Sequence, residues 1–181
     1  MYYDKYKKLG RHDLESLLEK QKKYIGQDRI LKFLKVKDVP SPERSGRNAG
    51  FDFFVPNDNR FYQALRSGEH ISIPSGVKVK IPHGYCLIGF NKSGLSVKYG
   101  IQVGACVIDE NYTGEISLHI LNYGPDDFVI KPGMKIMQFV LIKVNYAMVQ
   151  ECQSESEMYS TEDYEERGEK GVGSTGLKPE E

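Results

Sequence analysis

From residue 30 onward, the chain is a series of short apolar runs separated by turn residues. Prolines and glycines stand between most of these runs, which occupy residues 51–55, 71–73, 77–81, 85–90, 115–121, 128–130 and 137–144. Short strands at such close spacing are typical of sandwiches, jelly rolls and small barrels, and not of alternating β and α units. We therefore predict a mainly β fold whose first strand lies within residues 30–36, with one helical insertion at residues 59–66.

The two ends of the chain differ from this β core. Residues 12–24 carry leucines near helical spacing, which predicts a short amphipathic helix in a basic N-terminal extension. After residue 150 the apolar pattern stops, and an acidic stretch leads into a glycine-rich segment at residues 167–176. We expect three parts: the helical extension 1–29, the β core 30–150, and a linker with a flexible C-terminal arm, 151–181.

Charge and hydropathy argue against two kinds of partner. The formal net charge is +0 and the pI is about 6.9, so we expect no nucleic-acid binding through bulk electrostatics. No apolar run approaches the roughly 20 residues of a membrane helix, so we expect no membrane partner. The cysteines are scattered and the first residues are not those of a signal peptide. We therefore expect a cytoplasmic protein, in the host cytoplasm if it is viral or phage-encoded.

Two segments carry residue types suited to phosphate. The turn Lys92-Ser93-Gly94 offers a cation, a hydroxyl and free backbone N–H groups. In the C-terminal arm, Arg167 can pair with a phosphate in a bidentate manner, and the glycines allow successive N–H groups to converge on one anion. The arm is not a P-loop, because Ser174 stands where that motif requires lysine. A glycine-rich tail that binds nothing is the alternative.

Asp109 directly follows the apolar pair Val107-Ile108, in a stretch typical of a β-hairpin or tight turn. A partly shielded carboxylate at a strand end can act as general base to a water molecule. The alternative is an aspartate that hydrogen-bonds its own turn. Gln138 is polar within an apolar run, so it either meets a partner or faces away from the core. Asp52, early in another run, is a candidate for a hydrated cation.

Taken together, these segments resemble the trimeric dUTPase family (dUTP diphosphatases), whose motifs occur in the family's order. The matching stretches are AGFD at 49–52, KSG at 92–94, VIDENYTGE at 107–115, GMKIMQ at 133–138 and RGEKGVGSTG at 167–176. The resemblance extends from about residue 30 to residue 176, and the third and fifth motifs are the most specific.

The resemblance implies a jelly-roll-like β fold that assembles as a homotrimer, with active sites between subunits. The C-terminal arm of one subunit then closes over a site formed by its neighbours. The implied reaction is hydrolysis of dUTP to dUMP and pyrophosphate, by water attack on the α-phosphorus, with Mg²⁺. This reaction keeps uracil out of DNA and supplies dUMP for thymidylate synthesis.

Residue roles are carried over from matching positions. Asp109 resembles the base that deprotonates the attacking water. The backbone at Val107 and Ile108 resembles the segment that reads uracil, and Tyr112 would lie under the deoxyribose. Asp52 is expected to be an outer-sphere partner of the magnesium ion and not a direct ligand, because Mg²⁺ keeps several waters and prefers phosphate oxygens.

The remaining positions would contact the phosphates and the base. Ser93, Gly94 and Gln138 correspond to phosphate contacts, with Lys92 supplying positive charge. The arm would clamp the β- and γ-phosphates and cover the base through Arg167, Val172, Gly173, Ser174 and Thr175.

The chain departs from the family's pattern at four positions. Lys92 replaces an arginine, Cys106 stands where glycine is common, Met134 replaces an acidic residue, and Val172 replaces a phenylalanine that stacks on uracil. A lysine lacks the planar fork of arginine, which loosens orientation. Loss of a stacking ring, worth roughly 1–3 kcal/mol per base, weakens closure of the arm.

Two alternatives remain open on the same scaffold. A dCTP deaminase shares the fold, but that family uses a glutamate where this chain has His119, which disfavours deamination. A regulatory protein is the other alternative, since some phage members of the family bind transcriptional repressors. The N-terminal extension and the segment near residues 57–70 are either candidate surfaces for such a protein partner or accessory parts of the trimer.

Overall fold

A computed structural model describes residues 30–160 of the chain. Within this range, none of the helices has the length and apolar character that crossing a membrane requires. The described contacts divide the chain between Asn145 and Tyr146, so the core before this point and the segment after it are treated separately. The expected helix at residues 12–24 and the expected glycine-rich arm lie outside the described residues.

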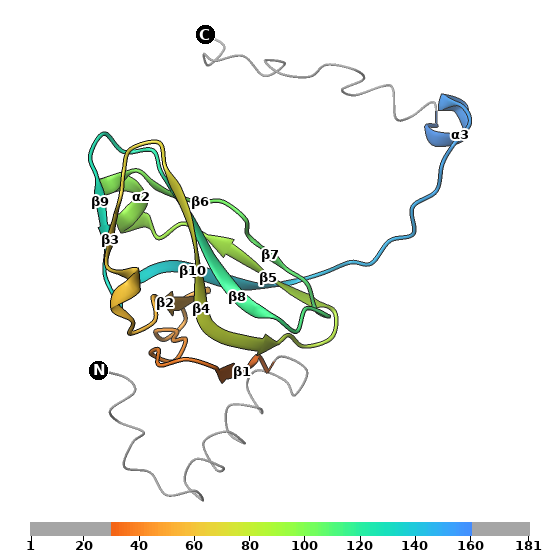
Figure 1. Ribbon diagram of the computed structural model, residues 1–181. Helices are drawn as coiled ribbons and strands as arrows, with labels where there is room; N and C mark the ends of the chain where they lie inside the picture. The colour runs from red at the N-terminus through yellow and green to blue at the C-terminus, as the bar shows by residue number, and fades with distance from the viewer. Residues whose placement is uncertain (1–29, 161–181) are drawn as a thin grey trace, which may run out of the picture. The chain divides into compact units, whose positions relative to one another are not determined.

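The core consists of two four-stranded sheets and one two-stranded sheet, all antiparallel (Figure 1). The first sheet has the order β1 (Lys32–Lys35), β4 (His70–Lys80), β8 (Glu115–Asn122), β6 (Ile101–Val103). The second has the order β2 (Gly50–Phe54), β10 (Lys135–Lys143), β5 (Tyr85–Phe90), β7 (Val107–Ile108). The small sheet pairs β3 (Gln63–Leu65) with β9 (Phe128–Ile130). The mainly β prediction is confirmed.

Both four-stranded sheets contribute to one hydrophobic core. Along β8, Ile116, Leu118 and Ile120 are fully buried, and the residues between them face outward, as the two-residue period of a strand requires. The second sheet contributes Phe53 and Phe139, whose rings meet edge-on with their centroids 4.8 Å apart. Alternation along these strands therefore supplies the closed apolar interior that holds the site's strands in register.

A bulge carries β4 through a segment that the sequence predicts as a break. Pro74 and Gly76 separate two apolar runs, but the strand continues from His70 to Lys80, with a register shift between Pro74 and Lys78. Gly76 has a φ of 75°, and its N–H donates to the Glu115 carboxylate at 2.6 Å. The side chain of buried Ser75 accepts from the N–H of Val77 at 3.1 Å. Local hydrogen bonds thus replace the ladder where it is interrupted.

Three helical segments complete the described chain. They are η2 (Asn59–Phe61), α2 (Ser93–Tyr99) and α3 (Glu155–Met158), the last a single turn in the segment expected to be a linker. The helical insertion expected at residues 59–66 is wrong beyond its first turn. Its second half is strand β3, because residues 63–65 pair with β9 and bury Leu65.

Candidate active site

Gln138 brings together three strands of the second sheet. On the central strand β10, it lies opposite Asp52 of β2 on one side and opposite Phe90 of β5 on the other. Its side-chain Nε2 donates to the backbone carbonyl of Asn91 at 2.8 Å. A side chain at Gly50 would overlap the Gln138 amide, which would then have to move from its present position. The expectation that Gln138 meets a partner is confirmed.

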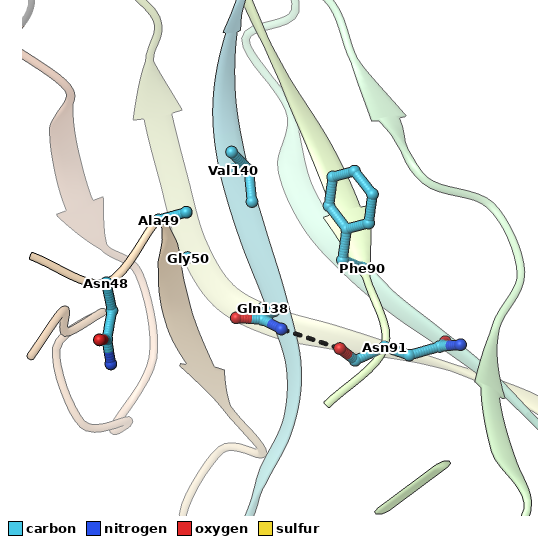
Figure 2. A pocket seen from close by; sticks show the side chains of 7 residues that line it. All are labelled: Asn48, Ala49, Gly50, Phe90, Asn91, Gln138 and Val140. Atoms are coloured by element: carbon cyan, nitrogen blue, oxygen red, sulfur yellow. Dashed lines mark hydrogen bonds between the residues drawn. The ribbon is translucent and has the colours of Figure 1, made fainter. Parts of the chain in front are cut away.

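A pocket of about 520 Å³ opens on this part of the sheet (Figure 2). Its wall combines three apolar side chains with amide and backbone groups and has no charged side chain. The lining residues are Asn48, Ala49, Gly50, Phe90, Asn91, Gln138 and Val140. A neutral wall of this kind suits the uncharged part of a ligand, and charged groups lie beside it at the ends of β2 and β5.

Lys92 and Asp52 form an ion pair next to this pocket. The Lys92 ammonium is bonded to one carboxylate oxygen of Asp52, and both side chains are about three-quarters buried, with exposed fractions of 23%. The other oxygen lies 3.5 Å from Nζ of Lys135, which is also bonded to Glu43. The hydrogen bond to Glu43 raises the pKa of Lys135. The network joins two lysines to two carboxylates and is neutral overall.

The turn expected at Lys92-Ser93-Gly94 is wrong in detail, because these residues begin helix α2. Lys92 is the N-cap, and its carbonyl accepts from the N–H groups of Leu95 and Ser96 at 2.9 Å. Ser93 and Gly94 are exposed, and no atom lies within 4 Å of where a Gly94 side chain would begin. The first N–H groups of a helix have no partner inside it, so this corner presents donors to an anion.

Asn91 fixes the corner that precedes this helix. Its side-chain carbonyl accepts from the N–H of Val103 at 2.7 Å, and its amide nitrogen donates to Gln102. Because its own backbone carbonyl accepts from Gln138, this one residue links β10 of the second sheet to β6 of the first. Nothing in the sequence indicates this role, since an asparagine before a turn is commonplace.

Asp109 lies at the end of β7, but not in a hairpin. Strand β7 pairs with β5 in the second sheet, while β8, which follows, pairs with β4 and β6 in the first. The segment between them is a tight turn, in which the N–H of Tyr112 donates to the Asp109 carbonyl at 3.1 Å. The hairpin alternative is therefore wrong and the tight-turn alternative is confirmed.

The expected shielding of Asp109 is also wrong within a single chain. Asp109 is exposed, because β7 is only two residues long and lies at the sheet edge. Within residues 30–160, no hydrogen bond joins its carboxylate to the turn that it begins. The turn is closed instead by the Tyr112 hydroxyl, which donates to the Glu115 carbonyl at 2.9 Å, while the Tyr112 ring covers Gly114.

Glu110 anchors this turn and was not singled out from the sequence. Its carboxylate accepts from the N–H of Gly84 at 2.8 Å and lies 2.9 Å from Nδ1 of His83. The turn that carries Asp109 is thereby tied to the turn between β4 and β5. The only sequence signal for this role of Glu110 is its position in the third motif, directly after the candidate base.

The structure therefore brings some predicted site residues together and separates others. Asp52, Lys92, Ser93, Gly94 and Gln138 form one group, which we call the phosphate corner after the role expected of it from the sequence. Val107, Ile108, Asp109 and Tyr112 form a second group at β7. Arg167, Val172, Gly173, Ser174 and Thr175 lie outside the described residues.

The two groups lie toward opposite ends of strand β5. The ladder places Ile108 opposite Leu87, so Asp109 follows toward Cys86, whereas the corner follows Phe90. Phe90 is four positions after Cys86, and at about 3.3 Å per residue this distance along the strand is about 13 Å. One chain does not bring its own aspartate to its own phosphate corner.

Known proteins match this chain over most of its length. A protein-family model described as dUTPase matches residues 36–176. The deoxyuridine 5'-triphosphate nucleotidohydrolase of Rattus norvegicus is 33% identical over 151 residues, which cover 82% of this chain and 68% of that protein. The protein of the same name from Chlamydia muridarum is 38% identical over 115 residues, covering 62% and 75%.

Solved structures agree on the fold. A mutant dUTPase of Staphylococcus bacteriophage 80alpha, solved with dUpNHpp, has a TM-score of 0.69 at 24% identity, covering 82% of this chain and 99% of that one. A phage phi11 dUTPase mutant, described with a structural Mg(II) ion, has a TM-score of 0.59 at 21% identity, covering 69% and 97%. Because the family model spans more than half of the chain and a relative above 30% identity covers four-fifths of it, the chain belongs to the dUTPase family.

Proposed function

We propose that this protein hydrolyses dUTP to dUMP and pyrophosphate with Mg²⁺, at sites shared between the subunits of a homotrimer. The family match and the names of the relatives support the reaction. The structural observation that carries the proposal is the phosphate corner. Three motifs distant in the sequence meet there, beside a neutral pocket, on strands β2, β10 and β5.

The phosphate corner has the donors that a triphosphate needs. Ser93 and Gly94 offer a hydroxyl and backbone N–H groups at the start of α2, and Gln138 offers an amide. Lys92 uses one of its three N–H donors on Asp52, which leaves two for phosphate oxygens. These groups would bind the phosphates and stabilise the charge that develops as pyrophosphate leaves.

Asp109 is the proposed base. Its carboxylate would take a proton from the water whose oxygen attacks the α-phosphorus, as the bond to pyrophosphate breaks. Val107 and Ile108 would bind uracil through their backbone groups, and Tyr112 would lie against the deoxyribose. Exposure of Asp109 in the single chain fits a group that becomes enclosed only when another subunit covers it.

The separation of Asp109 from the phosphate corner supports a shared site. A base and the phosphorus it serves must come within reach of one water molecule, whereas the two groups of one chain are separated by roughly 13 Å along β5. Arg167, Val172, Gly173, Ser174 and Thr175 would then close over a neighbour's site.

The residues present fit a magnesium ion carried by the substrate. Within residues 30–160, no three His, Cys, Asp or Glu side chains of one chain lie together as a metal-binding group. Each oxygen of Asp52 faces a lysine, and the roughly four acceptor sites of a carboxylate leave room for waters of a hydrated ion. Asp52 would hold such an ion through its waters, and the ion would neutralise phosphate charge.

A nucleotide panel tests the proposal. Pyrophosphate release should occur with dUTP and Mg²⁺, should stop with EDTA, and should be weak with dCTP, dTTP and UTP. Release of ammonia from dCTP would instead support the deaminase alternative, which neither His119 nor the relatives favour. A folded trimer inert toward dUTP would contradict the proposal and revive the regulatory alternative.

A further inference from the structure

His119 is a half-buried histidine on β8 that the proposed reaction does not use. It points away from the core, and its Nδ1 accepts a hydrogen bond from the backbone N–H of Ala105 at 2.8 Å. Its Nε2 lies 3.2 Å from Nδ1 of His70 on β4, and the two rings meet edge-on with centroids 5.3 Å apart. A side chain on Gly104 would overlap the His119 ring, so that ring is fitted against the chain there.

These contacts determine where the protons of the pair lie. The N–H of Ala105 can only donate, so Nδ1 of His119 must carry a lone pair. The proton of neutral His119 is then on Nε2, from which it is donated to Nδ1 of His70. A transition metal between the two rings does not fit this arrangement, because binding at Nε2 would move the His119 proton to Nδ1, against the N–H of Ala105.

The segment held by His119 leads directly into β7. Gly104 donates its N–H to the His119 carbonyl at 3.0 Å, and the Cys106 carbonyl accepts from Gly89 at 2.7 Å. Strand β7 has only two residues, so its position depends strongly on the backbone at residues 104–106, which precedes it. This segment, residues 104–106, is held on one side by β5 and on the other side by the His119 ring.

We propose that His119, held in its Nε2–H form by the Ala105 N–H at Nδ1 and by His70 at Nε2, is a positioning residue for the strand that reads uracil, and that protonation of this pair releases the strand. The proposal rests on the proposed function for the identity of the ligand. Protonated His119 carries N–H groups on both nitrogens, and these face the Ala105 donor on one side and His70 on the other. Two donors then oppose each other, and the corner at residues 104–106 loses its anchor.

The neighbouring charges do not offset this effect. His70 is the ionisable group facing His119 from β4, and the strand on the other side, β6, presents the neutral Gln102 on this face. The corner itself carries the Cys106 thiol. The carboxylate of Glu69 is bonded to the N–H of Arg66, and that of Glu115 to Lys37 and Gly76. Uracil binding should therefore weaken when this pair is protonated.

Three proteins test the proposal in steady-state assays. His119→Asn keeps an acceptor near the Nδ1 position but does not titrate, whereas His119→Phe fills similar space without an acceptor. At pH 7.5 we expect the KM for dUTP of the asparagine variant to stay within about twofold of wild type, and that of the phenylalanine variant to rise about fivefold, the effect of one ordinary hydrogen bond. The kcat of each should change less than its KM.

The pH profile separates positioning from a general packing role. Between pH 7.5 and pH 5.8, the wild-type KM should approach that of His119→Phe. Protonation of dUTP itself raises KM equally in all three proteins. The KM of the asparagine variant should rise by this amount only. Equal pH profiles of wild type and His119→Asn, or an unchanged KM in a folded His119→Phe, would overturn the proposal.

Nitrogen-15 NMR of the wild-type protein gives a readout independent of activity and of variant folding. At pH 7.5, His119 should carry its proton on Nε2, and the Ala105 amide should exchange slowly. On acidification, this exchange should slow by less than the fall in base catalysis alone would cause, because the Ala105 amide loses its protection. A proton on Nδ1 of His119 at pH 7.5 would overturn the proposal. If the protein did not hydrolyse dUTP, the proposed function would be contradicted. The position of the His119 proton would still test the hydrogen bonds of the histidine pair.

Discussion

The side-chain amide of Gln138 donates to the backbone carbonyl of Asn91 at 2.8 Å, and so ties the central strand β10 to the corner that begins α2. The two residues are 47 positions apart in the chain. Because Asn91 also bonds to β6, this contact holds the phosphate corner against both sheets. The corner is therefore built before any ligand arrives, which reduces the ordering that binding requires.

Substitution of Gln138 tests this preorganisation. Gln138→Glu has the same shape, but a carboxylate cannot donate to the Asn91 carbonyl and repels phosphate. We expect the KM for dUTP to rise by about tenfold or more, and the free energy of unfolding to fall by about 1–3 kcal/mol. Pyrophosphate release and urea unfolding measure the two effects. Gln63→Glu, on the exposed face of β3, makes the same change of charge and should alter neither.

The strand pattern could be predicted from sequence because alternation and turn residues are local signals. The apolar runs fall on β2, β4, β5, β8, β9 and β10. The bulge at Pro74–Gly76 could not be predicted, because its stability depends on the distant Glu115 carboxylate. Strand β3 could not be predicted either, because only its pairing with β9 makes residues 63–65 extended.

The candidate site, too, could be predicted only where the signal is local in the sequence. Motif residues could be named from the resemblance, and Gln138 stood out because it interrupts an apolar run. The ion pair between Lys92 and Asp52 and the bond between Lys135 and Glu43 could not be predicted, since their partners are 40 and 92 positions apart. Exposure of Asp109 could not be predicted either, because it follows from β7 being a two-residue edge strand.

The Lys135 network predicts a stability difference that changes with pH. The hydrogen bond to Glu43 raises the pKa of Lys135 above its ordinary 10.5, so the stabilisation is complete below that value and is lost as the pH rises through the higher folded-state pKa. Lys135 is more than a third exposed, so Lys135→Met should cost only about 0.5–1 kcal/mol at pH 8.

Urea unfolding of wild type and Lys135→Met at pH 8 and at strongly alkaline pH measures this difference. The difference in the free energy of unfolding between the two proteins should be steady from pH 7 to 9. It should shrink when the pH rises above the ordinary pKa of lysine. Lys131→Met, at an exposed lysine, controls for the loss of a surface charge. A gap that widens at alkaline pH would contradict the assignment.

Val172 gives a prediction for the C-terminal arm. If this position covers the base, Val172→Phe adds a ring worth roughly 1–3 kcal/mol of stacking, and the KM for dUTP should fall by about fivefold or more. Val172→Leu enlarges the side chain without a ring and should have a smaller effect. Steady-state assays of the three proteins at one magnesium concentration decide between stacking and mere size, and equal KM values would exclude a contact with uracil.

Asp109→Asn removes the proposed base and keeps the shape of the side chain. We expect kcat to fall by at least about a hundredfold, because general base catalysis contributes that much or more. Binding of a non-hydrolysable dUTP analogue, measured by calorimetry, should change little. Asp127→Asn, at an exposed aspartate in the loop before β9, should retain full turnover.

Subunit mixing tests the central claim that one site draws Asp109 and the phosphate corner from different chains. Asp109→Asn and a Ser93→Ala/Gln138→Glu double variant are each inactive at low dUTP by this account. The two variants are unfolded together and refolded as mixed trimers. A site then has roughly a one-in-four chance of combining an intact Asp109 from one chain with an intact phosphate corner from another, so roughly a quarter of wild-type activity should return. Trimers of the correct mass by light scattering with no recovered activity would contradict the account.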